Sequence, residues 1–564
     1  MNEWPFGDGR AAGYSGAAAS SLVRRPPFLA RLAGGVMLLE GWRRALLAIL
    51  AGAIATLALP PFNLPVFAFV SFPILLWLIG GVAGAPGAGL LGRAAPAFVV
   101  GWQFGFGYFV AGLWWLGAAM MVDVGEFWWA IPFAVLGLPA ILAFYFGFAA
   151  VLARLFWSEG AGRLFAFAAA FALAEYARGV LFTGFPWNEI GVMAAPIPLM
   201  MQSVSVVGLH GLTLGALLVF AAPALLADPA GRSRAAALAL VALLVVAHLG
   251  FGAWRLWNSQ EGTVADVSLL VVQPGIEQSD KWDEAEADRI WRRLVGVTLQ
   301  GKSKMGTPGR DAPRSRLIVW PESAFPFILT HHPEAIADLG QMLQPGESLA
   351  AGATRLEGDD NSLAYNSVYL IDDEGAIVEA RDKVHLVPFG EYLPLGSLLS
   401  RFGLHQIVEM PGGFTLGASH GSVPFAGTAG FLPLVCYEII FPSEYAAIVA
   451  GKNRPSFILN VTNDAWYGRT PGPYQHLRQA ELAAVALGLP LVRSANTGIS
   501  VVNDAYGRTI DSLALGSTGN VEAPLPDVLT APFYARYIDL AFWCAFVATC
   551  AVAIATALTM GKSN

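Results

Sequence analysis

The sequence predicts a protein of two parts: a multi-pass membrane domain of about eight α-helical spans, and an extracytoplasmic α/β domain placed before the last span. Three observations lead to this fold class. Apolar residues make up 55% of the chain and charged residues only 13%, about half the charged share of a soluble domain. Between Ala45 and Ala153 the only charged residues are Arg93, Asp123 and Glu126, which excludes a soluble fold there. After residue 260 the composition becomes that of a soluble protein.

The membrane part is read from eight apolar stretches, each near the roughly 20 residues with which a helix crosses the hydrocarbon. The first two are short and flanked by proline. The stretches cover residues 43–60, 64–82, 96–119, 127–153, 163–184, 203–226, 235–254 and 536–558. They divide the chain into a polar lead-in at 1–26, a seven-helix membrane domain at 27–257, a soluble domain at 262–528 and a closing transmembrane helix at 536–558.

The loops between these stretches differ in charge, and this difference predicts the orientation of the chain. Because Lys and Arg mark the cytoplasmic side, we predict that both termini are cytoplasmic and that residues 262–528 lie on the outer face. Arg178 stands on the opposite side, one helical turn from Glu175, with which we expect it to pair. The arginines of the alternate loops are Arg43, Arg44, Arg93, Arg154, Arg163, Arg232 and Arg234.

Three features of the membrane part carry separate expectations. Residues 1–26 have no short apolar segment that ends at a small-residue cleavage site, so the first span is predicted to be an uncleaved anchor. Residues 28–39 fit either an interfacial helix or an extension of the first span. His210 is a polar residue in the sixth span and is therefore functional or paired; we favour pairing with another helix.

The soluble region alternates short apolar runs with helical patterns, which predicts a mixed sheet with helices on its outer faces. Residues 369–380 and 501–510 each fit a β-hairpin. Strands are expected at 267–273, 317–320, 348–352, 367–371, 431–436 and 457–460, and helices at 283–300, 333–343 and 474–487.

Several classes of function are excluded by composition or by context. The net charge of −7 argues against a nucleic-acid-binding protein. Residues 296–303 match the phosphate-loop expression, but a charged amphipathic helix precedes them where the motif requires a strand, so we attribute the match to chance. His331 and His332 are adjacent and point apart, and the sequence has neither an HExxH motif nor a Cys–His cluster. We therefore expect no metal and no other cofactor.

Cys436 is the candidate nucleophile. It is the one cysteine of the soluble region, since Cys544 and Cys550 lie in the last span. A lone cysteine is commonly a small buried hydrophobe. Cys436, however, ends an apolar run and is followed by Tyr437 and Glu438, and a turn after a strand presents a nucleophile to a cleft.

A nucleophilic cysteine needs a proton acceptor and a positive charge near the developing oxyanion. Two upstream residues meet these needs: Glu322 follows the apolar run 317–321, and Lys383 lies in the segment 381–392. Taken singly, a Glu or a Lys is usually a solvated charge. A Glu, a Lys and a Cys at strand ends, in this chain order, form a specific pattern.

Around these residues the sequence resembles the nitrilase superfamily and, within it, the membrane-embedded apolipoprotein N-acyltransferases. The resemblance covers nearly the whole chain, apart from residues 1–26. The matching segments are 320–323 (WPES), 383–392 (KVHLVPFGEY), 436–438 (CYE), 463–468 (NDAWYG), 184–188 (GFPWN), and Gln273-Pro274 with Lys281-Trp282.

The resemblance implies an α-β-β-α sandwich with a Glu–Lys–Cys triad. In it Glu322 is the general base, Lys383 stabilises the oxyanion and Cys436 is the nucleophile. Glu391 is implied to be a second carboxylate that holds Lys383. The residues implied to support the site or to bind substrate are Trp282, Tyr392, Tyr437, Glu438, Asn463 and Trp466.

The same resemblance implies a reaction and its partners. A membrane phospholipid donates an acyl chain to Cys436, and the thioester passes it to the α-amino group of an S-diacylglyceryl cysteine on a bacterial apolipoprotein. The enzyme is then expected in the bacterial inner membrane, with its catalytic domain in the periplasm. Two alternatives stay open: a membrane-anchored amidase with water as acceptor, and a transporter or receptor with an inert nitrilase-like domain.

The segment 392–404 follows Glu391 directly and is rich in leucine. On a soluble enzyme it would be a buried helix. On a domain tethered to a bilayer it could equally be a lid that dips into the membrane interface and admits acyl chains.

Overall fold

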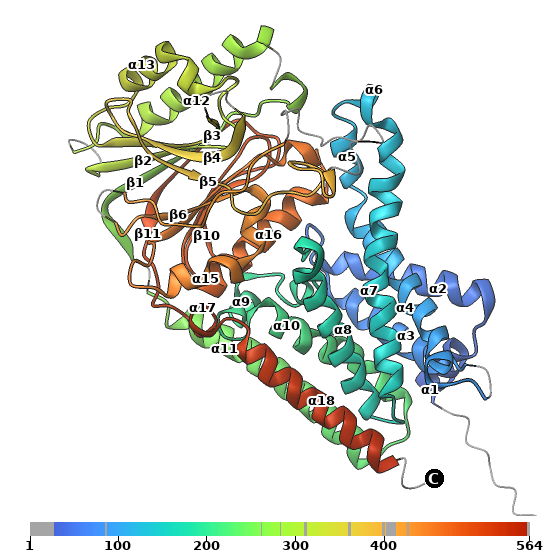
Figure 1. Ribbon diagram of the computed structural model, residues 1–564. Coiled ribbons are helices and arrows are strands. Elements are labelled where there is room, and N and C mark those ends of the chain that lie inside the picture. Colours follow the sequence, from blue (N-terminus) through green and yellow to red (C-terminus); the bar gives the residue numbers. More distant parts are fainter. Residues whose placement is uncertain are drawn as a thin grey trace, which may run out of the picture.

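The computed structural model in Figure 1 describes residues 27–84, 87–260, 262–281, 284–309, 313–358, 362–396, 401, 413–425 and 428–560. The predicted lead-in at 1–26, Trp282 and most of the segment 392–404 lie outside these residues. The expectations for them therefore stay predictions.

The membrane half consists, in its described part, of helices joined by short non-helical segments (Figure 1). Seven of its described helical segments are long and apolar enough to cross a membrane, and the segment Pro65–Gly81, at the second predicted span, is shorter. The main helices are α1 (Phe28–Met37), α2 (Gly41–Ala55), α3 (Ala68–Gly81), α4 (Leu90–Leu113), α7 (Leu138–Leu155), α8 (Gly162–Val180), α10 (Val204–Ala221), α11 (Arg232–Trp257) and α18 (Leu540–Met560). Shorter helices are α5 (Leu116–Met120), α6 (Val124–Phe127) and α9 (Pro198–Met201).

The structure decides two open questions about this half, the form of residues 28–39 and the pairing of His210, and it tests the predicted ion pair of Arg178. Residues 28–37 form a separate helix, α1, which ends before α2 begins and packs against α3, so they do not extend the first span. The predicted ion pair of Arg178 with Glu175 is confirmed, with 2.7 Å between Nη2 and Oε2. His210 is also paired: its Nδ1 lies 2.9 Å from Oε1 of Glu189.

The soluble half is an α/β domain built on two sheets. The first has the order β11-β1-β2-β3-β4-β5, and the second β10-β9-β8-β7-β6. The strands are β1 (Thr263–Gln273), β2 (Ser315–Trp320), β3 (Glu347–Glu357), β4 (Leu363–Ile371), β5 (Ile377–Asp382), β6 (Phe431–Val435), β7 (Phe457–Thr462), β8 (Leu491–Ala495), β9 (Ser500–Asn503), β10 (Thr509–Leu513) and β11 (Gly519–Pro526). The predicted strands and both hairpins are confirmed, whereas β8 and β11 were not predicted.

Four layers result, because each sheet buries one face against the other sheet and one face against helices. The face between the sheets is apolar, with Leu269 and Leu317 of the first meeting Phe431 and Leu459 of the second. The first sheet is covered by α12 (Ala287–Met305) and α13 (Pro333–Met342). The second is covered by α15 (Pro442–Ala450) and α16 (Pro471–Leu487). This arrangement confirms the predicted α-β-β-α sandwich.

The helical layer of α15 and α16 lies between the second sheet and the membrane helices (Figure 1). One continuous apolar core joins the two halves there, since α16 and the nearby α17 (Phe533–Tyr537) both contact α10. The α/β domain is therefore packed onto the helix bundle along this layer. The phosphate-loop match at 296–303 falls wholly inside α12, which agrees with its rejection as a nucleotide site.

Candidate active site

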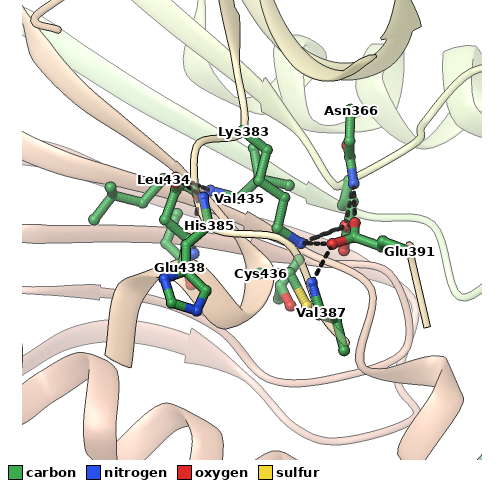
Figure 2. A network of polar contacts seen from close by, with 12 residues as sticks. Asn366, Lys383, His385, Val387, Glu391, Leu434, Val435, Cys436 and Glu438 are labelled. Atoms are coloured by element: carbon green, nitrogen blue, oxygen red, sulfur yellow. Dashed lines mark hydrogen bonds and ion pairs between the residues drawn. The ribbon is translucent and has the colours of Figure 1, made fainter. Parts of the chain in front are cut away.

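Glu322, Lys383 and Cys436 converge at one edge of the sandwich, where three strands end. Glu322 follows β2 and Lys383 follows β5 in the first sheet, while Cys436 follows β6 in the second. All three side chains are buried. Figure 2 shows Lys383, Glu391, Asn366 and Cys436 gathered in this space. The strand ends that the sequence marked are thus brought together by the pairing of the two sheets.

Lys383 is held by two carboxylates. Its Nζ donates to Glu391 at 2.9 Å and lies 4.0 Å from Oε1 of Glu322. Burial alone would lower the pKa of the ammonium, but the negative charges of Glu391 and Glu322 raise it above its ordinary value. The residue therefore stays a cation at neutral pH.

Asn366, in the middle of β4, joins the two carboxylates. Its Nδ2 donates to Oε1 of Glu322 at 2.8 Å and to Oε1 of Glu391 at 2.9 Å (Figure 2). The other oxygen of Glu391 accepts the backbone N–H of Val387 at 2.8 Å. Both carboxylates are thus fixed in direction, and Lys383 is placed between them.

Glu322 is set in a tight turn. Gly352 lies so close that a Cβ there would meet Cα of Glu322 at 2.5 Å, which explains a glycine in the middle of β3. Burial raises the pKa of the Glu322 carboxyl; Lys383 opposes this rise and Glu391 adds to it. The buried Lys281 donates from Nζ to the backbone carbonyl of Glu322 at 3.0 Å. Its own pKa is lowered by burial to about 8.

Cys436 is the first residue of a short turn, η12 (Cys436–Ile440), and its φ is +53°. Left-handed backbone is costly for a residue with a Cβ and is found where a site is held by its surroundings. Burial, together with the charge of Glu322, raises the pKa of the thiol to about 12, although Lys383 lowers it. The resting sulfur is therefore a thiol, and it needs a base to become a nucleophile.

Glu438 links the turn that begins at Cys436 to the loop that follows Lys383. One of its oxygens accepts the backbone N–H of Val435 at 2.9 Å, and the other accepts the backbone N–H of Val384 at 2.8 Å and a bond from His420 at 2.9 Å. Burial would raise the pKa of this carboxyl, but His420 and the backbone donors lower it overall. These bonds join the end of β6, before Cys436, to the backbone just after Lys383.

Tyr437 connects the same turn to the membrane half. Its hydroxyl donates to the backbone carbonyl of Gly184 at 3.1 Å, and its ring stacks on that of Trp187, with 6.3 Å between centroids. Both partners belong to the segment 184–188, which was singled out in the membrane half by its sequence. The contact explains why a motif in the membrane half accompanies one in the α/β domain.

The other predicted residues lie around this centre. Tyr392 packs in a small apolar cluster with Leu386 and Phe414. Asn463 donates to Gln278 at 2.6 Å and accepts from Asn496 at 3.1 Å. Trp466 is half-buried in η13 (Asp464–Tyr467). Their roles stay predictions, as does that of Trp282.

Sequence reasoning missed the role of Asn366. A signal existed, because a buried amide in an otherwise apolar strand needs a hydrogen-bond partner. Lys281 and Asp464 lie in segments that the sequence singled out, but they were given no role, and His476 was not singled out. His476 and Asp464 form a buried pair at 2.9 Å. In the part of the chain that the structure describes, no group of three His, Cys, Asp or Glu side chains could hold a metal ion.

A buried cysteine, a lysine and two carboxylates at the edge of an α-β-β-α sandwich define a nitrilase-type domain. The carbon–nitrogen hydrolase family model matches residues 274–529. Among solved structures, an amidase of the nitrilase superfamily from Nesterenkonia AN1 is similar at 17% identity, covering 48% of this chain and 94% of that one with a TM-score of 0.35.

The membrane half identifies the branch. The model of the apolipoprotein N-acyltransferase N-terminal domain matches residues 51–222. The apolipoprotein N-acyltransferase of Brucella melitensis biotype 1 is 53% identical over 90% of this chain and 94% of its own length. That of Agrobacterium fabrum is 46% identical over 94% and 99%. The chain belongs to the apolipoprotein N-acyltransferase family.

Proposed function

We propose that this acyltransferase moves an acyl chain from a membrane phospholipid, through a thioester on Cys436, to the α-amino group of S-diacylglyceryl cysteine on a bacterial apolipoprotein. Family membership supports lipoprotein N-acylation in general. The observation that carries the finer proposal is the burial of the Cys436 thiol at the edge of the sandwich where Lys383 is buried between Glu391 and Glu322. A thiol in that setting can be acylated only with the help of the groups around it.

In the first half-reaction Glu322 takes the proton of the thiol, and the sulfur attacks the ester carbonyl of the phospholipid. The charge that develops on the carbonyl oxygen is stabilised by the Lys383 ammonium. The C–O bond then breaks, and Glu322 returns the proton to the departing lysophospholipid oxygen. The raised pKa of Glu322 suits a group that must both accept and release a proton.

In the second half-reaction the amine of the apolipoprotein attacks the thioester. Glu322 takes a proton from the attacking nitrogen, the C–S bond breaks, and the sulfur recovers a proton from Glu322. One cysteine thus divides an ester-to-amide exchange into two easier steps. Glu391 and Asn366 hold Lys383 and Glu322 in place during both steps, and Glu438 holds the two strands together.

Intact-mass measurement after incubation with phospholipid tests the thioester. Wild-type protein should gain one acyl mass that hydroxylamine removes. Cys436→Ala and Glu322→Gln should gain none, the first for lack of a nucleophile and the second for lack of a base. Cys550→Ala is the matched control and should acylate like wild type.

An acyl adduct that persists in Cys436→Ala would refute the assignment. A diacylated lipopeptide added afterwards should receive the acyl chain. Release of free fatty acid without transfer would instead favour the membrane-anchored hydrolase. Absence of any adduct or turnover in wild type would favour the inert domain.

We further propose that the α/β domain faces the periplasm and that both termini are cytoplasmic, as the arginine asymmetry predicts. Single cysteines can test this in a chain whose three native cysteines are replaced. Ser233, exposed at the start of α11, should resist an impermeant maleimide in spheroplasts, whereas Ala376, exposed in the turn between β4 and β5, should react. The opposite labelling pattern would invert the orientation.

A further inference from the structure

Two neighbouring residues of α16, Gln475 and His476, stand between the membrane half and Cys436. Both side chains are buried. His476 points toward the nucleophile turn, and Gln475 binds two tryptophans of the membrane half. The mechanism above uses neither residue.

His476 holds the backbone of the nucleophile itself. Its Nε2 lies 3.2 Å from the carbonyl oxygen of Cys436, and its Nδ1 lies 2.9 Å from Oδ1 of Asp464. A carbonyl oxygen can only accept, so Nε2 carries the proton that is donated to Cys436. Nδ1 also lies 3.1 Å from Nη2 of Arg493, from which it can accept. Asp464 is fixed in turn by Arg493 at 2.8 Å, and these side chains are fully shielded from solvent.

Gln475 holds α16 to the membrane half. Its Oε1 accepts from the indole N–H of Trp187 at 2.9 Å and from that of Trp115 at 3.1 Å. Trp115 lies between α4 and α5, and Trp187 lies in the segment after α8. The Trp187 ring also contacts that of His476, with 5.2 Å between centroids. The Oε1 atom of Gln475 therefore links two segments of the helix bundle to α16, at the residue next to His476.

The nucleophile turn is thus held from two sides. From α16, His476 donates a hydrogen bond to the carbonyl of Cys436. From the membrane half, Gly184 accepts a hydrogen bond from Tyr437, the residue after Cys436. Cys436 has the left-handed backbone that persists only where surrounding contacts enforce it. Both sets of contacts end in the membrane half.

We propose that Gln475 and His476 are positioning residues which make the membrane half a structural part of the active centre. The tryptophans fix α16, and His476 on α16 fixes the conformation in which the sulfur of Cys436 meets its substrate. The inference rests on the proposed role of Cys436 as nucleophile. It extends that proposal by assigning the helix bundle a second task besides anchoring the enzyme.

A matched pair of substitutions at His476 tests the proposal in the full-length protein. His476→Gln places an amide N–H near the position of Nε2 and should keep the bond to Cys436. His476→Asn places its amide near the position of Nδ1, so it should keep the contacts with Asp464 and Arg493 and lose the bond to Cys436. We expect His476→Asn to slow acyl-enzyme formation about tenfold or more at saturating phospholipid, while His476→Gln stays within about threefold of wild type. The KM for phospholipid should not change in either variant.

The membrane side of the coupling is tested by Gln475→Leu, which removes the shared acceptor, and Gln475→Glu, which keeps it. Gln475→Leu should lower the kcat of acyl-enzyme formation. Gln475→Glu should keep that kcat close to the wild-type value. Arg478→Leu is the control. Arg478 also binds the membrane half, at the carbonyl of Ala195, but it is not part of the contacts that run from the tryptophans through Gln475 and His476 to Cys436. It should acylate at the wild-type rate.

The outcomes separate this inference from the proposed function. A wild-type protein that forms no thioester on Cys436 refutes the proposed function. A wild type that acylates normally, together with a His476→Asn variant that matches it, refutes the coupling alone. Equal slowing in His476→Asn and His476→Gln, accompanied by the same loss of thermal stability, would mean a merely structural role and would also refute it.

Discussion

Each half of this protein contains a buried cation held by carboxylates, and the two networks can be compared. In the α/β domain, Lys383 is held between Glu391 and Glu322. In the membrane half, Arg178 pairs with Glu175 and also donates to the backbone carbonyls of Phe185 and Trp187. Both cations are almost completely buried. Both networks satisfy the rule that a charge removed from water must be paired.

The networks differ in what their cations face. Lys383 is a positive charge that acts on the pKa of a buried thiol, whereas Arg178 fixes the loop 184–188 on which Tyr437 rests. Burial and pairing are therefore common to both networks. What distinguishes the network around Lys383 is the thiol of Cys436, the proposed nucleophile, beside it. Loss of each cation should consequently damage a different property of the enzyme.

Lys383→Met should show the largest loss of rate. Removal of one donor to a developing oxyanion typically costs ~10²–10³ in rate, or roughly 3–4 kcal/mol. The folded and inserted variant should form the acyl-enzyme very slowly, as followed by intact mass. Lys383→Arg should rescue little, because a planar guanidinium does not fit the compact site of an ammonium.

Lys304, an exposed lysine of α12, offers the control for that experiment. Lys304→Met should acylate like wild type. Glu391→Gln should show a milder defect than Lys383→Met, since the lysine stays but is less well held. If the turnover of Lys383→Met were within about threefold of wild type, the assignment of Glu322, Lys383 and Cys436 as a catalytic triad would be wrong.

Arg178→Met should instead reduce stability. It leaves Glu175 as an uncompensated buried charge, a change that typically costs roughly 3–5 kcal/mol. Thermal unfolding in detergent should show a clearly lowered midpoint. A double variant, Glu175→Leu with Arg178→Leu, should be less destabilised than Arg178→Met alone. If Arg178→Met kept its stability but lost acylation, the contrast between the two networks would be wrong.

Asn366→Leu should give an intermediate loss of rate. Its amide makes two hydrogen bonds to carboxylates, and a hydrogen bond to a charged group contributes about 1.5–3 kcal/mol. Acyl-enzyme formation should slow by about tenfold or more, with little change in the KM for phospholipid. Asn520→Leu, which removes a half-buried amide bonded to the backbone of Val297 in α12, is the comparison and should leave the rate per folded molecule unchanged.

The smallest expected effect is a displacement of the pH profile. Because burial raises the pKa of Glu322 above its ordinary 4.5, the base is lost to protonation at a higher pH than a solvated glutamate would be. Acyl-enzyme formation should therefore fall as the pH drops through that raised pKa. The hydrogen bond from Asn366 lowers the pKa of Glu322. Asn366→Leu should therefore move the acidic limb of the pH–rate profile to higher pH. An unmoved limb would argue against Glu322 as the base.

The sequence alone determined the division into membrane and soluble parts and the strands that carry Glu322, Lys383 and Cys436. These features are local: hydropathy sums over neighbouring residues, and a strand with its following turn is encoded within a few positions. The arginine asymmetry that predicts orientation is local in the same sense.

The tertiary structure decided which residues complete the site. Asn366 meets Glu322 across 44 positions of sequence, and His476 meets Cys436 across 40. Tyr437 meets Gly184 across 253. The order of strands in two sheets and the packing of α16 between them and the bundle create these contacts. Hydrogen bonds act over about 3 Å, so residues remote in sequence are joined only where the whole chain has packed, and no local pattern records which ones will meet.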